Sequence, residues 1–385
     1  MVARDTGERH RASTPLELLF DLTFVVAVAA AAAQLAHAIV EGHAAQGLLG
    51  YLMVFFAIWW AWMNFTWFAS AYDCDDTLYR LVTLLQMGGV LVLAAGVPAA
   101  LNEQNWTAVT AGYVIMRVAM VVQWLRAAHD DPTHRATARR FAVGIAVVQV
   151  GWLARLALPE AAGFVGFFVL VAAELAVPVW AERRNGTTWH PDHIAERHGL
   201  FTLIVLGESV LAASRALAPA VQAGLDLSTV VVGGGGLILL FGLWWLYFLT
   251  SAGEGLARHR ERSYWWSYGH YGIFAALAAL GAALEVVAEM LVHPIASPAG
   301  VVGFAVAIPV CVFLLLTWTL HSPLDPALVR KSGYVIAACA VIIGIAATTA
   351  VGLPVPWAVL AMGVPVSALV AVRVTSDHRN AWARA

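Results

Sequence analysis

The sequence predicts an all-α, polytopic integral membrane protein with about twelve transmembrane helices, arranged as two parallel six-helix repeats. Three observations carry this prediction: the apolar composition, the length of the apolar runs, and the one-sided distribution of arginine. Of the 385 residues, 61% are hydrophobic and only 12% are charged. Because a soluble domain carries about 25% charged residues, the composition excludes an ordinary soluble protein.

The apolar runs define the expected helices, because about 20 apolar residues are needed to cross the hydrocarbon layer. A helix also closes its backbone hydrogen bonds internally, as lipid requires. The runs that meet this length are 15–40, 47–71, 77–98, 106–128, 137–158, 161–181, 196–218, 228–252, 264–292, 299–321, 328–350 and 354–374.

The basic residues lie almost entirely on one side when the connections between these runs alternate across the membrane. One face carries eighteen of them, whereas the other carries only Arg155 and Arg215. Loops on the cytoplasmic side of membrane proteins have this excess of basic residues. We therefore expect an even number of spans, with both termini in the cytoplasm.

The two halves of the chain show a weak internal similarity. A duplicated unit of six helices keeps its orientation in the membrane, because six is even. We predict one repeat over 1–185 and a second over 186–385. Four short matches occur in the same order in both halves: 17–26 with 196–205, 59–60 with 244–245, 129–140 with 321–331, and 158–159 with 353–354.

Two carboxylates interrupt the first apolar run. Glu17 and Asp21 are four residues apart, so they share one face of the expected helix. A carboxylate at the membrane centre costs about 2.5–3.5 kcal/mol on insertion scales, and both acids therefore need partners. We predict a polar cluster near the cytoplasmic side, with ordinary interfacial solvation of the residues at 196 and 197 as the alternative. Residues expected at similar depth are Glu196, Arg197, His198 and His270.

Arg117 and Glu174 are expected at matching depths near the membrane midplane. An isolated buried arginine is costly, so the sequence predicts an ion pair between them, structural rather than catalytic. Glu208 also lies near the midplane, followed at similar depth by the glycines 233–236. These glycines indicate either close helix packing or a broken helix that lines a site.

No cofactor or metal site is expected. The three cysteines, Cys74, Cys311 and Cys339, are too scattered for a disulfide framework or a zinc site. The stripe Glu285, Glu289 and His293 is more typical of a hydrated vestibule than of a metal centre. There is no phosphate-binding loop, no H-E-x-x-H and no G-x-S-x-G, which leaves nucleotide-driven transport and ordinary proteolysis without support.

Two motifs carry a family resemblance: R-A-S-T-P-L-E-L-L-F-D-L-T-F-V from Arg11, and E-R-H-G-L-F-T-L-I-V-L-G-E-S-V from Glu196. Together they resemble the signatures of the bacterial low temperature requirement A family, and the likeness covers essentially the whole chain. The resemblance implies a multi-pass protein of the bacterial inner membrane and no established substrate. The positions that match the family motifs are Glu17, Phe20, Asp21, Glu196, Gly199, Gly207, Glu208 and Ser209.

We predict a proton-coupled secondary transporter of a small solute or ion. The alternatives are a cation channel and a non-transporting structural or stress-sensing protein linked to growth at low temperature. An enzyme is not expected, because no nucleophile and base stand in a recognisable arrangement. The expected partner is the lipid bilayer rather than nucleic acid, and homo-oligomerisation stays open. The residues assigned to substrate or proton coupling are Glu17, Asp21, Glu196, Arg197, His198, Glu208, Ser209 and His270.

Overall fold

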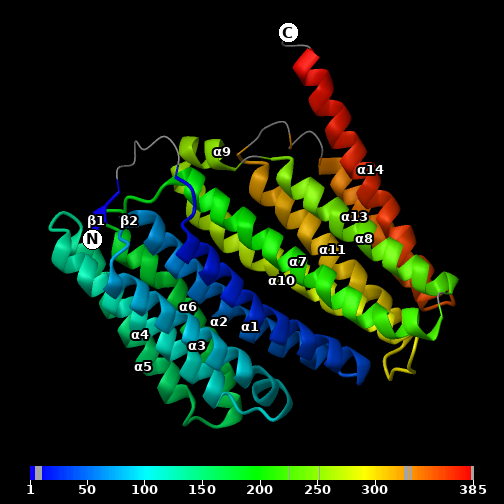
Figure 1. The fold of residues 1–385 in the computed structure, drawn as a ribbon, viewed down its shortest axis with the longest axis horizontal. Helices are drawn as coiled ribbons and strands as arrows, with labels where there is room; N and C mark the ends of the chain where they lie inside the picture. The colour runs from blue at the N-terminus through cyan, green and yellow to red at the C-terminus, as the bar shows by residue number, and fades with distance from the viewer. Residues whose placement is uncertain (5–10, 225, 251, 325–327, 329–331, 383–385) are drawn as a thin grey trace. The chain divides into compact units, whose positions relative to one another are not determined.

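A computed structural model of the protein describes residues 1–4, 11–224, 226–250, 252–324, 328 and 332–382, and it is built almost wholly of helices (Figure 1). The long helices are α1 (Pro15–Val40), α2 (Ala44–Ala71), α3 (Thr77–Asn102), α4 (Thr107–Asp130), α5 (Arg135–Arg155), α6 (Glu160–Glu182), α7 (Pro191–Ala223), α8 (Leu227–Phe248), α10 (Ser263–Glu289), α11 (Ala299–His321), α13 (Ser332–Thr349) and α14 (Val355–Trp382). The short elements are α9 (Gly253–Arg258), η1 (Arg260–Arg262), and the antiparallel pair β1 (Val2–Ala3) and β2 (Tyr72–Asp73).

Each of the twelve predicted apolar runs is therefore a helix. Within the described ranges, eleven helices are long and apolar enough to cross a membrane. The twelfth, α5, carries four arginines over its 21 residues, which lowers its mean hydropathy. The prediction of an all-α, multi-pass membrane protein is confirmed. One boundary differs in a way that affects the site, because α7 begins at Pro191 rather than at 196 and so includes His193.

The chain forms two compact units. Unit 1 comprises Met1–Ala31 and Met53–Arg197, and unit 2 comprises Ala32–Leu52 and His198–Ala385. Within unit 1, α3 packs on α4, α4 on α5 and α5 on α6; within unit 2, α10 packs on α11, α11 on α13 and α13 on α14. Successive helices thus pack in the same order in each unit. The duplication over 1–185 and 186–385 stays a prediction.

The turn between α1 and α2 belongs to unit 2. Gly42 has a φ of +82°, a left-handed conformation that ends α1 without the steric penalty of a side chain. Two hydrogen bonds close this end of the helix, from the Gly42 N–H to the Ile39 carbonyl and from the His43 N–H to the Ala38 carbonyl. The Ala296 N–H donates to the Val40 carbonyl at 2.8 Å, which ties the turn to the segment after α10.

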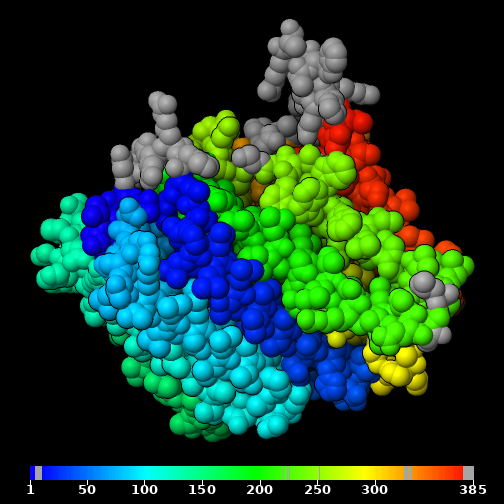
Figure 2. All heavy atoms as spheres, viewed as in Figure 1, coloured from blue at the N-terminus to red at the C-terminus, as the bar shows by residue number. Residues whose placement is uncertain are grey.

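The first helix exposes apolar side chains on its outer face and buries its two acids together with further apolar side chains. Leu19, Leu22 and Val26 are 46–53% exposed, and α1 lies at the surface as the dark blue band in Figure 2. Phe20 and Asp21 on the other face are completely buried. This arrangement suits a helix in contact with lipid, where charged groups face the protein interior.

The four glycines of α8 do not break the helix, since α8 is continuous from Leu227 to Phe248. A side chain at Gly235 would lie 2.9 Å from the backbone of Leu360 in α14, whereas one at Gly234 would meet nothing within 4 Å. The broken-helix interpretation is therefore wrong. At Gly235 the missing side chain lets the backbones of α8 and α14 approach closely.

We expect Gly235→Ala to lower the free energy of unfolding by about 1–3 kcal/mol, because the new methyl group collides with backbone that cannot rotate away. Gly234→Ala is the matched control one residue away. It should be neutral or stabilising by up to about 1 kcal/mol, since alanine favours a helix over glycine. Thermal unfolding of both variants in detergent checks this, and equal melting temperatures would contradict the packing role.

Candidate functional site

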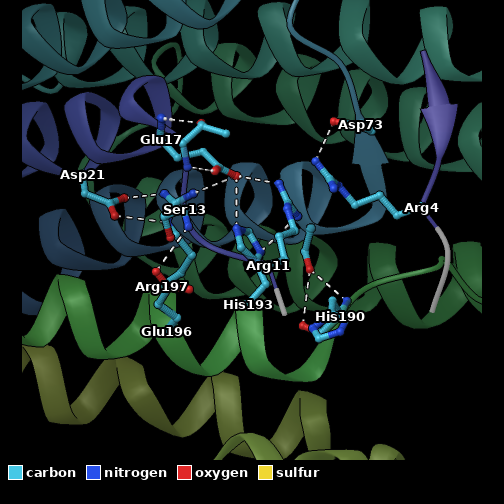
Figure 3. Close-up of polar contacts among 12 residues, drawn as sticks. Arg4, Arg11, Ser13, Glu17, Asp21, Asp73, His190, His193, Glu196 and Arg197 are labelled. Carbon is cyan, nitrogen blue, oxygen red and sulfur yellow. Dashed lines mark hydrogen bonds and ion pairs between the residues drawn. The ribbon is translucent and has the colours of Figure 1, made fainter. Parts of the chain in front are cut away.

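A fully buried ion pair joins α1 to the first turns of α7 in unit 1. Arg197 Nε donates to Asp21 Oδ2 at 3.1 Å, and the Arg197 NH2 group donates to Asp21 Oδ1 (Figure 3). The indole N–H of Trp62, on α2, donates to the same Oδ1 at 2.6 Å. Asp21 and Arg197 are both 0% exposed. The forked geometry satisfies both carboxylate oxygens, which is the arrangement that makes a buried pair tolerable.

Glu17 lies in the same cluster. Hydrogen bonds with Thr14 at the start of α1 fix its position. The Thr14 N–H donates to Glu17 Oε2 at 2.7 Å, while the Glu17 N–H donates to Thr14 Oγ1 at 3.3 Å. This reciprocal pair is a capping box, with Pro15 suited to the first helical position. The other oxygen, Oε1, lies 3.0 Å from the Arg11 NH2 group and 3.4 Å from the Arg197 NH1 group.

His193 completes the cluster from α7. Its Nδ1 lies 3.2 Å from the NH1 group of Arg11, and because a guanidinium can only donate, this nitrogen accepts. The ring proton is then on Nε2, which lies 3.2 Å from Glu17 Oε1. With His193 neutral, the two guanidinium groups of the cluster balance its two carboxylates. Burial lowers the pKa of Arg11, and the neighbouring Glu17 carboxylate opposes that effect.

The structure brings together three of the six residues predicted for this cluster, namely Glu17, Asp21 and Arg197. Glu196 is only partly buried and lies at the edge, where its carboxylate accepts from the Ser13 N–H at 3.2 Å. Arg11, His193 and Trp62 also belong to the cluster and were not predicted from the sequence. The signal for His193 was its spacing of four residues from Arg197, which matches the spacing between the two acids of α1.

His198 and His270 belong to unit 2, and their place in the predicted cluster stays a prediction. Adjacent residues on a helix point in different directions, so the side chain of His198 does not point the same way as that of Arg197. Its ring centroid lies 4.8 Å from that of His270 within unit 2. His270 Nδ1 lies 2.8 Å from the Trp266 carbonyl and so carries the proton, which leaves Nε2 to accept from the Tyr247 hydroxyl at 3.0 Å.

Both nitrogens of His270 are therefore used within the protein. Across the parts of the chain that the structure describes, no three His, Cys, Asp or Glu side chains are placed to hold a metal ion. The predicted stripe is not one helical face, because α10 ends at Glu289 and His293 lies four residues beyond it. His293 Nε2 is 3.9 Å from Glu289 Oε1, and both side chains are exposed.

Glu174 is the acceptor at the centre of a second buried network in unit 1. Arg117 donates to its Oε2 at 2.8 Å, which places the predicted ion pair in the structure. Both side chains are 0% exposed. The carboxylate receives five donors in all, from α2, α4 and α5. The other four are Trp60 Nε1 at 2.9 Å, Tyr113 OH at 2.8 Å, Gln149 Nε2 at 3.0 Å and Trp152 Nε1 at 3.3 Å.

Glu208 and Glu285 stand in a different environment in unit 2. Both side chains are partly buried, and the charge of Glu285 interacts with those of Glu289, Glu208 and Arg215. Among the described residues, no hydrogen bond reaches either carboxylate. Ser209, next to Glu208, donates to the carbonyls of Val205 and Leu277 at 3.0 and 3.2 Å, so it contributes to helix packing.

Asp21→Asn should lower the free energy of unfolding by about 3–5 kcal/mol, because it removes the carboxylate that pairs with both sides of the buried Arg197 guanidinium and leaves only Glu17, at 3.4 Å. The double variant Asp21→Asn, Arg197→Gln should regain part of that loss, since neither charge is then left alone. Chemical unfolding in detergent measures the cycle, with Glu196→Gln as the control that keeps its single accepted hydrogen bond. Losses that simply add in the double variant would contradict the pairing.

Glu174→Gln should destabilise the protein by a similar amount of about 3–5 kcal/mol, because a neutral amide leaves Arg117 uncompensated and turns one acceptor into a donor. The control is Glu160→Gln, at the exposed first position of the same helix, which should change stability by less than about 0.5 kcal/mol. Equal melting temperatures for the two variants would show that the buried network does not support the fold.

Comparison with known proteins agrees with the two motifs. The family model described as bacterial low temperature requirement A protein matches residues 12–373. An uncharacterized protein of Rhizobium meliloti (strain 1021) is 25% identical over 296 residues, which cover 71% of this chain and 69% of that relative. The matched range includes Glu17, Asp21, His193 and Arg197, while Arg11 lies just before it.

Proposed function

This chain belongs to the bacterial low temperature requirement A family, and we propose that it is a proton-coupled secondary transporter of a small solute or ion. One observation carries the proposal. Glu208 and Glu285 are partly buried carboxylates on membrane-spanning helices, and among the described residues no hydrogen bond reaches either of them. Ionisable groups within spans commonly mark the pathway of an ion or a proton.

The hydrogen-bond patterns separate the acids by role. Glu17, Asp21 and Glu174 each accept hydrogen bonds from several donors, which hold these carboxylates in place in the fold. Glu208 accepts no hydrogen bond from any residue that the structure describes, so binding a proton would break none of the described hydrogen bonds. We therefore assign proton coupling to Glu208, with Glu285 beside it, and assign the cluster around Asp21 and Arg197 to holding α1 and α7 together.

The proposal includes a location and a set of partners. The excess of arginine on one set of connections supports both termini being in the cytoplasm, and the family supports the bacterial inner membrane. The lipid bilayer is the expected surrounding. We propose no catalytic activity, no cofactor and no nucleic-acid partner.

A scaffold or sensor without transport is the second candidate. It is favoured by the saturated bonding of Glu174, which is typical of an acid that locks helices together. A cation channel lined by Asp21 has less support, because this carboxylate is completely buried and is bonded to Arg197 and Trp62.

Proteoliposomes with an imposed pH gradient and an internal pH-sensitive dye test the transporter. With Na⁺, K⁺ and neutral amino acids as probes, the intact protein should show saturable, solute-dependent proton flux. Glu208→Gln should abolish it, because the amide cannot take up and release a proton, while the exposed Glu160→Gln should leave it unchanged.

Three results would contradict this assignment. Flux that survives Glu208→Gln removes the coupling role of that residue. Single-channel currents that persist in both Glu208→Gln and Asp21→Asn indicate a channel. Absence of flux and current with every probe, in protein shown to be folded by its melting temperature, indicates a scaffold.

A further inference from the structure

Two cysteine side chains of unit 2 face one another across α11 and α13, helices that pack side by side (Figure 1). Cys311 Sγ donates to the Cys339 carbonyl at 3.6 Å, and Cys339 Sγ donates to the Cys311 carbonyl at 3.9 Å. The two thiol groups also interact with one another directly. Both are free and buried. Within the described ranges, no third His, Cys, Asp or Glu completes a metal site with them.

Small residues let α11 and α13 approach closely along this seam. Towards the start of α11, a side chain at Gly303 would collide with that of Thr349, near the end of α13. The two helices therefore run in opposite directions, with Cys311 opposite Cys339. A disulfide requires two backbones that lie close together and side chains that face one another. The reciprocal contacts of the two sulfur atoms with the opposite carbonyls meet both conditions.

The cysteine pair lies at the lipid-facing edge of the seam. Apolar residues that are 36–57% exposed flank each cysteine, three positions before it and four after it: Ile308 and Leu315 on α11, Ile336 and Ile343 on α13. Because the helices run in opposite directions, these exposed positions fall on the same side of the seam. Lipid therefore borders the pair from both helices.

The depth of the pair limits which oxidants can reach it. Cys311 lies ten residues before the end of α11 at His321, a rise of about 15 Å, which is half the thickness of the hydrocarbon layer. An oxidant for these thiols must therefore dissolve in the lipid.

We propose that Cys311 and Cys339 are an oxidation site that forms an intramolecular disulfide, with a membrane quinone as the oxidant. In this step two S–H bonds break and one S–S bond forms, while the two electrons and two protons reduce the quinone to a hydroquinone. Quinones are the final acceptors for protein thiols in the bacterial periplasm. The new bond fixes α11 to α13 near the middle of the bilayer, and a thiol reductant reverses it.

Incubation of the full chain in liposomes with a short-chain ubiquinone tests the site, because a fully substituted ring does not add a thiol to its carbon atoms. Remaining thiols are then blocked and the protein is digested with trypsin. Trypsin cleaves after Arg330 and Lys331, between the two cysteines, so only a disulfide joins the peptides 263–330 and 332–373. We expect the joined peptide, lighter by two hydrogen atoms than its parts, in most of the protein. A reductant should separate it.

The controls use a second oxidant and the third cysteine. Glutathione disulfide does not enter the hydrocarbon layer, so it should modify the partly exposed Cys74 and leave the pair reduced. Cys74→Ser should not change the yield of the joined peptide, whereas Cys311→Ala and Cys339→Ala should each abolish it. Melting temperatures identify the variants that fold, and the comparison of the two oxidants needs no variant.

A pair that stays reduced in the folded, intact protein under the quinone would overturn the proposal. So would equal oxidation of the pair by glutathione disulfide, because the thiols would then be open to water. Joined peptides found only in a cross-linked dimer on a non-reducing gel would also overturn it, since the thiols would then meet between chains. The proton flux assigned to Glu208 is measured on reduced protein and does not depend on these results.

Discussion

The Asp21–Arg197 ion pair is the interaction on which the arrangement of α1 and the start of α7 depends. Each charge is completely buried in a helix that is long and apolar enough to cross a membrane, and neither could stay there alone without a cost of several kcal/mol. The pair is satisfied by its forked geometry and by the indole N–H of Trp62. The chain positions of these three residues show that helices distant in sequence must pack together before either charge is stable.

Two further buried carboxylates of unit 1 also need partners for their charge, and each has a different set of donors. Glu17 combines a local capping box with the more distant cations Arg11 and Arg197. Glu174 instead gathers five donors from three other helices. In both places the hydrogen bonds hold the carboxylate in a fixed position. Glu208 and Glu285 accept no hydrogen bond from the described residues, and for this reason the proposed proton coupling is assigned to unit 2.

Helix packing depends on small residues as well as on charges, because a membrane offers little hydrophobic drive for helices to associate. Gly235 lets α8 approach the backbone of α14 closely, and its neighbour Gly234 faces open space. A run of four identical residues thus includes positions with different roles.

The sequence by itself determined the helices, because span length and composition are set by the thickness of the bilayer. It also showed that Glu17, Asp21, Arg117 and Glu174 needed compensation, and depth alone indicated the Arg117–Glu174 pair. Only the tertiary structure decided that Arg197 faces Asp21 while the next residue, His198, joins His270. The physical reason is that depth follows from the position along one helix, whereas contacts depend on the rotation of each helix and on where α7 begins.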